Sequence, residues 1–134
     1  MVGDGNAGLS VAAQLLLAGH GLDVAILELP GKHYYQQAWT LVGGGAFDVT
    51  DTERPESDYI PKGATWLKDA AATFEPKANT VMTAGGRRLT YDYLVVCPGI
   101  PLDWSKIKGL PEALDKNGMC SNYCYELAPT PGSA

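Results

Sequence analysis

Residues 3–8 read Gly3-Asp4-Gly5-Asn6-Ala7-Gly8, a G-x-G-x-x-G pattern that leads straight into the apolar segment 9–17. In a dinucleotide-binding loop, the first glycine permits a tight turn and the second lets the backbone approach a pyrophosphate. The third allows the following helix to pack closely on a strand. The phosphates then lie over the helix N-terminus, where N–H groups and the helix dipole favour negative charge. The pattern predicts a dinucleotide site; the alternative is a glycine-rich loop that only packs.

A second apolar run supports the dinucleotide interpretation. It reads Asp23-Val24-Ala25-Ile26-Leu27-Glu28 and ends in an acid about 20 residues after the glycines, where a partner for a ribose hydroxyl belongs. The segment between is predicted to be a helix over residues 9–19, closed by Gly19-His20-Gly21. Only Met1 and Val2 precede the motif, although the strand before such a loop is usually a longer run buried on both faces. Either the start of the chain is misassigned or the chain is a fragment with an incomplete domain.

The composition argues against several classes of protein. The 134 residues are 46% hydrophobic and 19% charged, which is typical of a globular domain and not of a disordered chain. The net charge is −5 and no basic cluster extends beyond Arg87-Arg88, so nucleic-acid binding is not expected. No run approaches the roughly 18 apolar residues that span a bilayer, and the N-terminus does not resemble a signal peptide. The expected location is the cytoplasm or the membrane periphery.

The three cysteines predict no metal site and no disulfide framework. Cys120 and Cys124 form a C-x-x-x-C pair without a second ligand pair nearby, so zinc is not expected. Cys97 lies inside an apolar run and is predicted to be a small buried hydrophobic residue.

Residues 33–42 are rich in aromatic and amide side chains. They read His33-Tyr34-Tyr35-Gln36-Gln37-Ala38-Trp39-Thr40-Leu41-Val42 and follow a turn at 29–32. In a βαβ arrangement they come just after the carboxyl end of a strand, where ligands bind in such sheets. They would suit a surface that packs against a flat ring system. An ordinary short amphipathic helix that uses its aromatics as core is the equally open alternative.

The remaining chain is predicted to be rich in strands and loops. Residues 46–63 indicate loop or short helix, and residues 64–68 a strand. A small antiparallel meander is predicted at 71–74, 80–83 and 88–90, followed by a buried strand at 91–99 that ends in a tight turn. The sequence after Gly99 is typical of loops. We expect a partial FAD/NAD(P)-binding domain over 1–127 and a disordered tail over 128–134.

Together these features resemble the FAD domain of the two-dinucleotide-domain flavoprotein disulfide reductases. The glycine motif, Glu28, the meander and residues 91–99 are the superfamily marks; in relatives the last run usually ends Ala-Thr-Gly, and here it ends Cys97-Pro98-Gly99. Within the superfamily, residues 33–43, 107–112 and 121–123 are most similar to the sulfide:quinone oxidoreductases. The implied fold is α/β: a Rossmann-like FAD-binding domain in three layers, with a parallel sheet and a small antiparallel meander, here incomplete.

The resemblance also implies which residues contact the cofactor, FAD. The pyrophosphate would lie against the Gly5 to Gly8 backbone, the adenosine ribose against Glu28, and the adenine beside Ala71. Gln36 would contact the cofactor beyond Glu28, and Pro98 and Gly99 would approach it where the chain leaves the sheet. The full set of implied cofactor-binding residues is Gly3, Gly5, Asn6, Ala7, Gly8, Glu28, Gln36, Ala71, Pro98 and Gly99.

The chemistry implied by the resemblance is oxidation of sulfide through cysteine and flavin, with the electrons passed to a membrane quinone. The protein's part is to position sulfur against the flavin and tune it. In the family the reactive cysteine pair lies further along the chain, so we assign no catalytic residue here and expect none at Cys120 or Cys124. Membrane association would likewise come through parts absent from this sequence.

Two alternatives remain beside that function. One is a non-catalytic, truncated nucleotide-binding chain, which the length favours. The other is a relative of the flavin-dependent NADH:quinone oxidoreductases, which the 33–43 stretch disfavours. We expect the 134 residues alone to bind FAD weakly or not at all.

Overall fold

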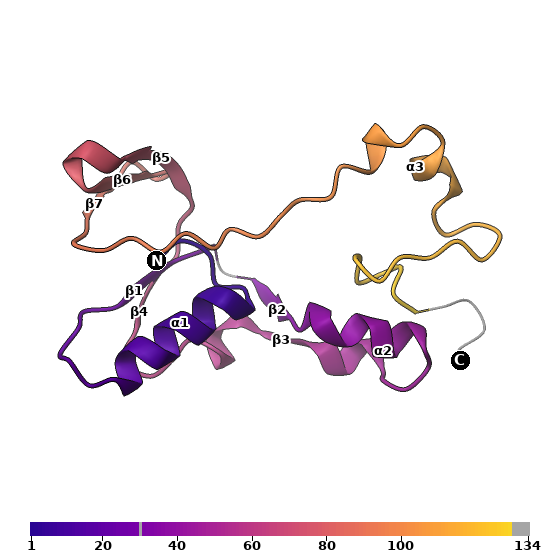
Figure 1. Ribbon diagram of the computed structural model, residues 1–134, viewed down its shortest axis with the longest axis horizontal. Coiled ribbons are helices and arrows are strands. Elements are labelled where there is room, and N and C mark those ends of the chain that lie inside the picture. The colour runs from indigo at the N-terminus through magenta and orange to yellow at the C-terminus, as the bar shows by residue number, and fades with distance from the viewer. Residues whose placement is uncertain (30, 130–134) are drawn as a thin grey trace. The chain divides into compact units, whose positions relative to one another are not determined.

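The computed structural model describes residues 1–29 and 31–129 and divides the chain into two compact units (Figure 1). The first unit comprises Met1–Gly31 and Pro55–Gly99, and the second comprises Lys32–Arg54 and Ile100–Ala134. The architecture is mixed α/β, with one parallel and two further small sheets, which confirms the predicted fold class.

The first unit is built on helix α1, Asn6–Leu17, packed against two parallel strands, β1, Ala25–Leu27, and β4, Thr65–Leu67. Leu9 and Ala12 form the buried face of α1 and meet Val24 and Ile26 from the β1 segment. Burial of these apolar side chains is the main force that holds the helix on the strands. Gly19 adopts a left-handed φ of 70° just past the helix end, which ends α1 in the usual way. The helix and both strands lie where the sequence predicts them.

Val2 occupies the place of the strand that the sequence nearly lacks. It forms parallel bridges with Leu27 on one side and Val96 on the other. Its N–H donates to the Val95 carbonyl at 2.9 Å, and its carbonyl accepts from the Cys97 N–H at 2.7 Å. The parallel order is therefore β4, β1, Val2, Val96. A single residue supplies the central position of a doubly wound arrangement.

The prediction of a buried strand at 91–99 is wrong in its extent and burial. Val96 forms an isolated bridge instead of a strand, and it is 49% exposed, while Tyr93 is 91% exposed. Cys97 is half-buried instead of fully buried. The physical reason is that an apolar run is buried on both faces only where layers cover both faces, and among the described residues this segment pairs with Val2 alone.

The predicted antiparallel meander is confirmed. Strands β5, Ala71–Glu75, β6, Thr80–Thr83, and β7, Arg88–Thr90, pair in that order. The first turn contains the 3₁₀ helix Pro76–Ala78 and Asn79 with φ at 47°, and the second contains Gly86 with φ at 81°. Val81 is buried against Val2 and Leu27, so the meander shares its core with the parallel strands.

The second unit is made of short elements around a small aromatic core. Trp39 and Val42 are buried on α2, Trp39–Gly43, together with Ala128. The Trp39 indole donates to the Thr52 hydroxyl at 3.0 Å, and the ring of Tyr125 lies 6.2 Å from that of Trp39. For Trp39 the structure thus favours the core alternative of the prediction. The other elements of the chain are β2, Lys32–Tyr34, β3, Glu53–Pro55, α3, Leu110–Ala113, and the 3₁₀ helices Gln36–Ala38, Val49–Thr52, Glu56–Asp58 and Trp104–Lys106.

Residues 130–134, most of the predicted disordered tail, lie outside the described residues. Ala128 belongs to the described part and is buried beside Trp39 and Val42. The division at residue 127 stays a prediction.

Candidate functional site

The three glycines of residues 3–8 have three different environments. Gly3 has φ at +91°, and a Cβ there would lie 2.0 Å from the Cys97 carbonyl oxygen. A Cβ on Gly8 would lie 2.1 Å from the Gly3 carbonyl oxygen. A Cβ on Gly5 would meet nothing within 4 Å. Gly3 and Gly8 are thus required by packing inside the chain, whereas Gly5 leaves open space at the surface.

Gly5 is also the N-cap of α1. Its φ and ψ are −58° and 174°, and its carbonyl accepts from the Leu9 N–H at 3.0 Å. Asn6, Ala7 and Gly8 form the first turn of this 12-residue helix, and none of them is acidic. An uncompensated helix N-terminus with open space beside its cap suits a phosphate group. The residues present therefore fit the pyrophosphate of a dinucleotide.

Glu28 follows β1 at the same edge as the glycine loop. The Gly3 N–H donates to the Leu27 carbonyl at 3.2 Å, which ties the start of the loop to the end of β1. The Glu28 carboxylate accepts from the Leu29 N–H at 3.0 Å and is half-buried. The carboxyl ends of parallel strands form one edge, so Glu28 and the loop are brought together where such sheets bind ligands.

Ala71, Pro98 and Gly99 belong to the same unit. Ala71 opens β5 and packs against the cluster of Val2, Leu27 and Val81. A Cβ on Gly3 would come within 3.1 Å of the Pro98 nitrogen, so Pro98 passes directly beside the loop. Gly99 has φ at +76°, consistent with the predicted tight turn. The structure thus gathers these residues around the ends of the parallel strands.

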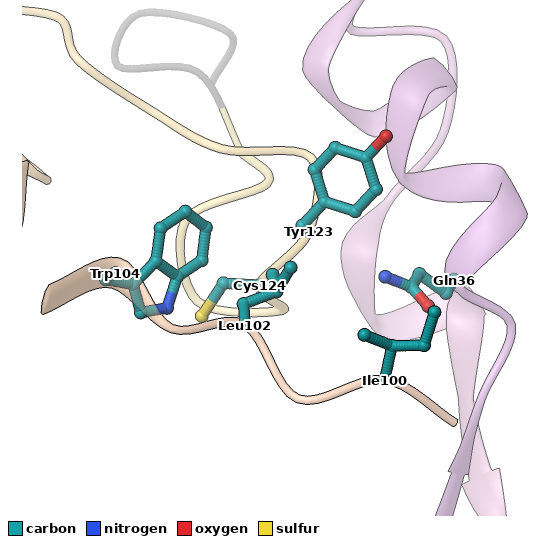
Figure 2. Close-up of a pocket in the computed structure, with 6 residues that line it drawn as sticks. All are labelled: Gln36, Ile100, Leu102, Trp104, Tyr123 and Cys124. Carbon is teal, nitrogen blue, oxygen red and sulfur yellow. The ribbon is translucent and has the colours of Figure 1, made fainter. Parts of the chain in front are cut away.

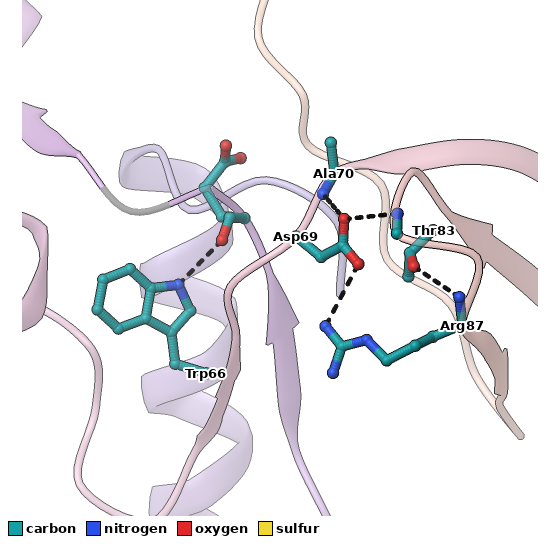
Figure 3. A network of polar contacts seen from close by, with 7 residues as sticks. Trp66, Asp69, Ala70, Thr83 and Arg87 are labelled. Atoms are coloured by element: carbon teal, nitrogen blue, oxygen red, sulfur yellow. Dashed lines mark hydrogen bonds and ion pairs between the residues drawn. The ribbon is translucent and has the colours of Figure 1, made fainter.

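Asp69 organises the turn that precedes Ala71 (Figure 3). Its Oδ1 accepts from the N–H groups of Ala70 at 2.9 Å and Gly85 at 3.1 Å, and its Oδ2 accepts from Arg87 at 3.4 Å. A hydrogen bond from Thr83 is the largest cause that lowers the pKa of the Asp69 carboxyl. The ionised carboxylate therefore joins the entry of β5 to the β6–β7 turn.

A carboxyl pair that the sequence does not indicate joins Asp4 of the loop to Glu56. Asp4 is 7% exposed and Glu56 is 4% exposed. Burial raises the pKa of Glu56, the hydrogen bond with Asp4 opposes this, and the charge of Glu28 raises it further. Two carboxyl groups share a hydrogen bond only when one of them is protonated. The pair escapes sequence analysis because its members are 52 positions apart (56 − 4) in the printed sequence.

Gln36 lies in the second unit, exposed at the start of the 3₁₀ helix Gln36–Ala38. It lines a cavity of about 540 Å³ together with aromatic and apolar side chains (Figure 2). The other lining residues are Ile100, Leu102, Trp104, Tyr123 and Cys124. The predicted contact of Gln36 with a cofactor stays a prediction.

The three cysteines, Cys97, Cys120 and Cys124, are free and half-buried thiols. The Cys124 Sγ donates to the Glu126 carboxylate at 2.9 Å. Burial first, and then this hydrogen bond, raise the pKa of the Cys124 thiol. A thiol held in its protonated form is a poor nucleophile. Across residues 1–29 and 31–129 we find neither a cluster of metal-ligating side chains nor a helix long and apolar enough to cross a membrane.

The parallel strand order, the glycine loop and the antiparallel meander define the class of protein. It is a Rossmann-like unit, and one solved structure with the same fold is the sulfide:quinone oxidoreductase of the hyperthermophilic bacterium Aquifex aeolicus. The two match with a TM-score of 0.70 at 22% identity, over 95% of this chain and 28% of that chain. That likeness shows the fold.

Sequence comparison identifies the particular relatives. The mitochondrial sulfide:quinone oxidoreductase of Dictyostelium discoideum is 52% identical over 94% of this chain, and that of Mus musculus is 37% identical over 92%. The chain is similar to one part of these two relatives and spans 28% and 27% of their length. No protein-family model matches the sequence.

Proposed function

We propose that this chain is the FAD-binding segment of a sulfide:quinone oxidoreductase. The observation that supports it best is the contrast among the three glycines. Backbone atoms occupy the space that a Cβ would need at Gly3 and Gly8, whereas the corresponding space at Gly5 is open. Packing alone explains the first two glycines. The open direction at a helix N-cap is explained by a ligand that approaches the backbone. The similarity to a sulfide:quinone oxidoreductase over 94% of the chain supports FAD as the proposed ligand.

Each cofactor-binding residue has a proposed role. The backbone of Gly5, Asn6, Ala7 and Gly8 binds the pyrophosphate, and Gly3 makes the turn that presents it. Glu28 accepts hydrogen bonds from the adenosine ribose, and Ala71 lies beside the adenine through its backbone. Gln36 contacts the cofactor beyond Glu28, and Pro98 and Gly99 approach it after Cys97.

In the whole enzyme, bound FAD supplies two-electron redox chemistry between sulfide and a quinone. The residues of this chain bind and orient the cofactor. None of its three cysteines is proposed as the nucleophile, and for Cys124 burial and the hydrogen bond to Glu126 raise the pKa of the thiol. Membrane contact, quinone binding and the reactive cysteines are assigned to the parts of the relatives that this chain does not match.

A non-catalytic nucleotide-binding chain is the second candidate. The observation in its favour is the raised pKa of the Cys124 thiol, which makes this cysteine a poor nucleophile. A relationship to the NADH:quinone oxidoreductases is disfavoured, because residues 33–43 follow the sulfide:quinone oxidoreductase pattern.

FAD titration with sulfide addition tests the proposal. The sequence leaves weak binding and no binding open, and the open space beside the Gly5 N-cap favours the first. We therefore expect the parent chain to bind FAD weakly but saturably, as measured by the quenching of FAD fluorescence. The Gly5→Val variant fills the open space beside the N-cap and abolishes that binding. Gly31→Ala is the matched control, because a Cβ on Gly31 also meets nothing within 4 Å, and it retains parental affinity.

The outcomes separate the candidates. Absence of FAD binding by the parent chain, or unchanged affinity in Gly5→Val, would contradict the FAD-binding role. Bleaching of the bound flavin by sulfide would show catalysis by this chain, and retention of the flavin absorbance would assign it a binding role alone. Tight, stoichiometric FAD would contradict the expectation of weak binding.

A further inference from the structure

Trp66 lies on β4, beside the end of β1. Glu28 is the residue that directly follows β1. The strands pair in register, with Ile26 opposite Trp66 and Leu27 opposite Leu67. Past this ladder the Glu28 N–H donates to the Leu67 carbonyl at 3.1 Å. The Trp66 indole N–H donates to the Glu28 carbonyl at 3.1 Å (Figure 3). Both backbone polar groups of Glu28 are therefore bonded to β4.

These two bonds hold Glu28 where the strand has already ended. β1 ends at Leu27; the Glu28 N–H still bonds the backbone of β4, whereas the Glu28 carbonyl is bonded by a side chain. The indole supplies a side-chain donor in place of a further ladder N–H. With both of its backbone groups bonded, Glu28 has little freedom to rotate its peptide planes, and its Cβ direction is set.

The indole itself is held in position. The Lys68 ammonium lies 4.5 Å from the centroid of the Trp66 ring, a cation–π distance that favours one ring orientation. Trp66 is half-buried, so the ring is partly shielded from water, which would otherwise compete for the Glu28 carbonyl. The Trp66 ring is therefore held in the orientation in which its N–H bonds the Glu28 carbonyl.

We propose that Trp66 is a positioning residue for the nucleotide site: its indole N–H holds the Glu28 backbone so that the carboxylate is presented to the ribose hydroxyl. The inference rests on the proposed role of Glu28. Trp66 contributes affinity through the orientation of Glu28, and therefore contributes only where the ligand has a ribose hydroxyl to bind.

That dependence separates positioning from a general structural role. ADP, the adenosine diphosphate part of FAD, has both ribose hydroxyls, and 2′,3′-dideoxy-ADP lacks both. The ratio of the two dissociation constants measures the contact made by Glu28. A variant that only loosens the fold weakens both ligands equally and leaves the ratio unchanged.

The experiment measures both ligands by isothermal titration calorimetry on four 134-residue chains: the parent, Glu28→Gln, Trp66→Phe and Trp39→Phe. Trp66→Phe keeps an aromatic ring and removes the N–H. Trp39→Phe is the matched control, because it removes an indole hydrogen bond of similar length, 3.0 Å to Thr52, in the second unit. If Trp66→Phe unfolds, benzothienylalanine at position 66 keeps the two-ring shape and removes only the donor.

We expect the parent to prefer ADP and Glu28→Gln to lose that preference. Trp66→Phe should reduce it roughly three- to tenfold, the range that one neutral hydrogen bond contributes, and Trp39→Phe should leave it unchanged. If Trp66→Phe keeps the parental ratio of dissociation constants while Glu28→Gln loses the preference for ADP, only the role of Trp66 is overturned. No preference in the parent, or an unchanged ratio in Glu28→Gln, would overturn the proposed role of Glu28 and this inference with it.

Discussion

Alanine at each of the three loop glycines should separate packing from ligand binding. For Gly3→Ala the left-handed φ costs about 1–2 kcal/mol. The 2.0 Å overlap with the Cys97 carbonyl oxygen must also be relieved by moving backbone. That movement strains the 2.7 Å bond from the Cys97 N–H to Val2, a bond worth about 1 kcal/mol. The expected loss is about 3–5 kcal/mol, a large part of the roughly 5–15 kcal/mol that stabilises a domain.

Gly8→Ala should be intermediate, and Gly5→Ala close to neutral. A Cβ on Gly8 would lie 2.1 Å from the Gly3 carbonyl oxygen. Relieving this overlap moves α1 away from β1, which lowers the free energy of unfolding by about 1–3 kcal/mol. On Gly5 the Cβ meets nothing. Alanine is a poorer N-cap than glycine by about 1 kcal/mol, which a stiffer unfolded chain offsets by about 0.4–1 kcal/mol.

Urea unfolding followed by circular dichroism gives the three stabilities. The order of loss should be Gly3→Ala, then Gly8→Ala, then Gly5→Ala, with the last within error of the parent. A Gly5→Ala variant as unstable as Gly3→Ala, or a stable Gly3→Ala, would refute the assignment of packing and binding roles.

Three further predictions follow from single contacts. Val81→Ala should lower the free energy of unfolding by about 1–3 kcal/mol in the same urea assay, because Val81 is 2% exposed in the core of the meander; an unchanged midpoint would contradict that core. The depressed pKa of Asp69 means that its contribution to stability is present above its unfolded pKa and is lost as pH falls through the folded pKa. Asp69→Asn should therefore be less stable than the parent at pH 7 and equal to it in strong acid, and a constant difference would argue against the ionised network. Iodoacetamide should label Cys124 slowly at pH 7, and Glu126→Gln should speed the labelling, because Glu126 helps to raise the pKa of the Cys124 thiol. Mass spectrometry of the labelled peptide gives the two rates, and equal rates would contradict the effect of Glu126.

Much of the first unit could be predicted from local sequence patterns. The glycine spacing, the apolar run that ends in Glu28 and the turns of the meander are local signals, and the helix and strands lie where those signals place them. The burial of residues 91–99 could not be predicted in the same way. Their apolar character is local, but their exposure depends on which neighbours cover them, and Tyr93 is left 91% exposed.

The supporting contacts of the site join residues far apart in sequence. The Trp66 indole bond to Glu28 spans 38 positions, and the carboxyl pair joins Asp4 to Glu56. Neither follows from a periodicity or a motif, because each arises only after β4 and the glycine loop have packed beside β1. Val2 shows the same point, since pairing on both sides gives one residue the role of a strand.

A residue-resolved NMR titration of the 134-residue chain with FAD tests the central claim most directly. We expect saturable shifts of the backbone amides of Gly5 to Gly8 and of Glu28 that follow a single weak binding curve, and we expect Gly5→Val to abolish them. Amides of residues 3–8 that do not move at saturating FAD, while the chain remains folded, would contradict the claim that this loop binds the cofactor.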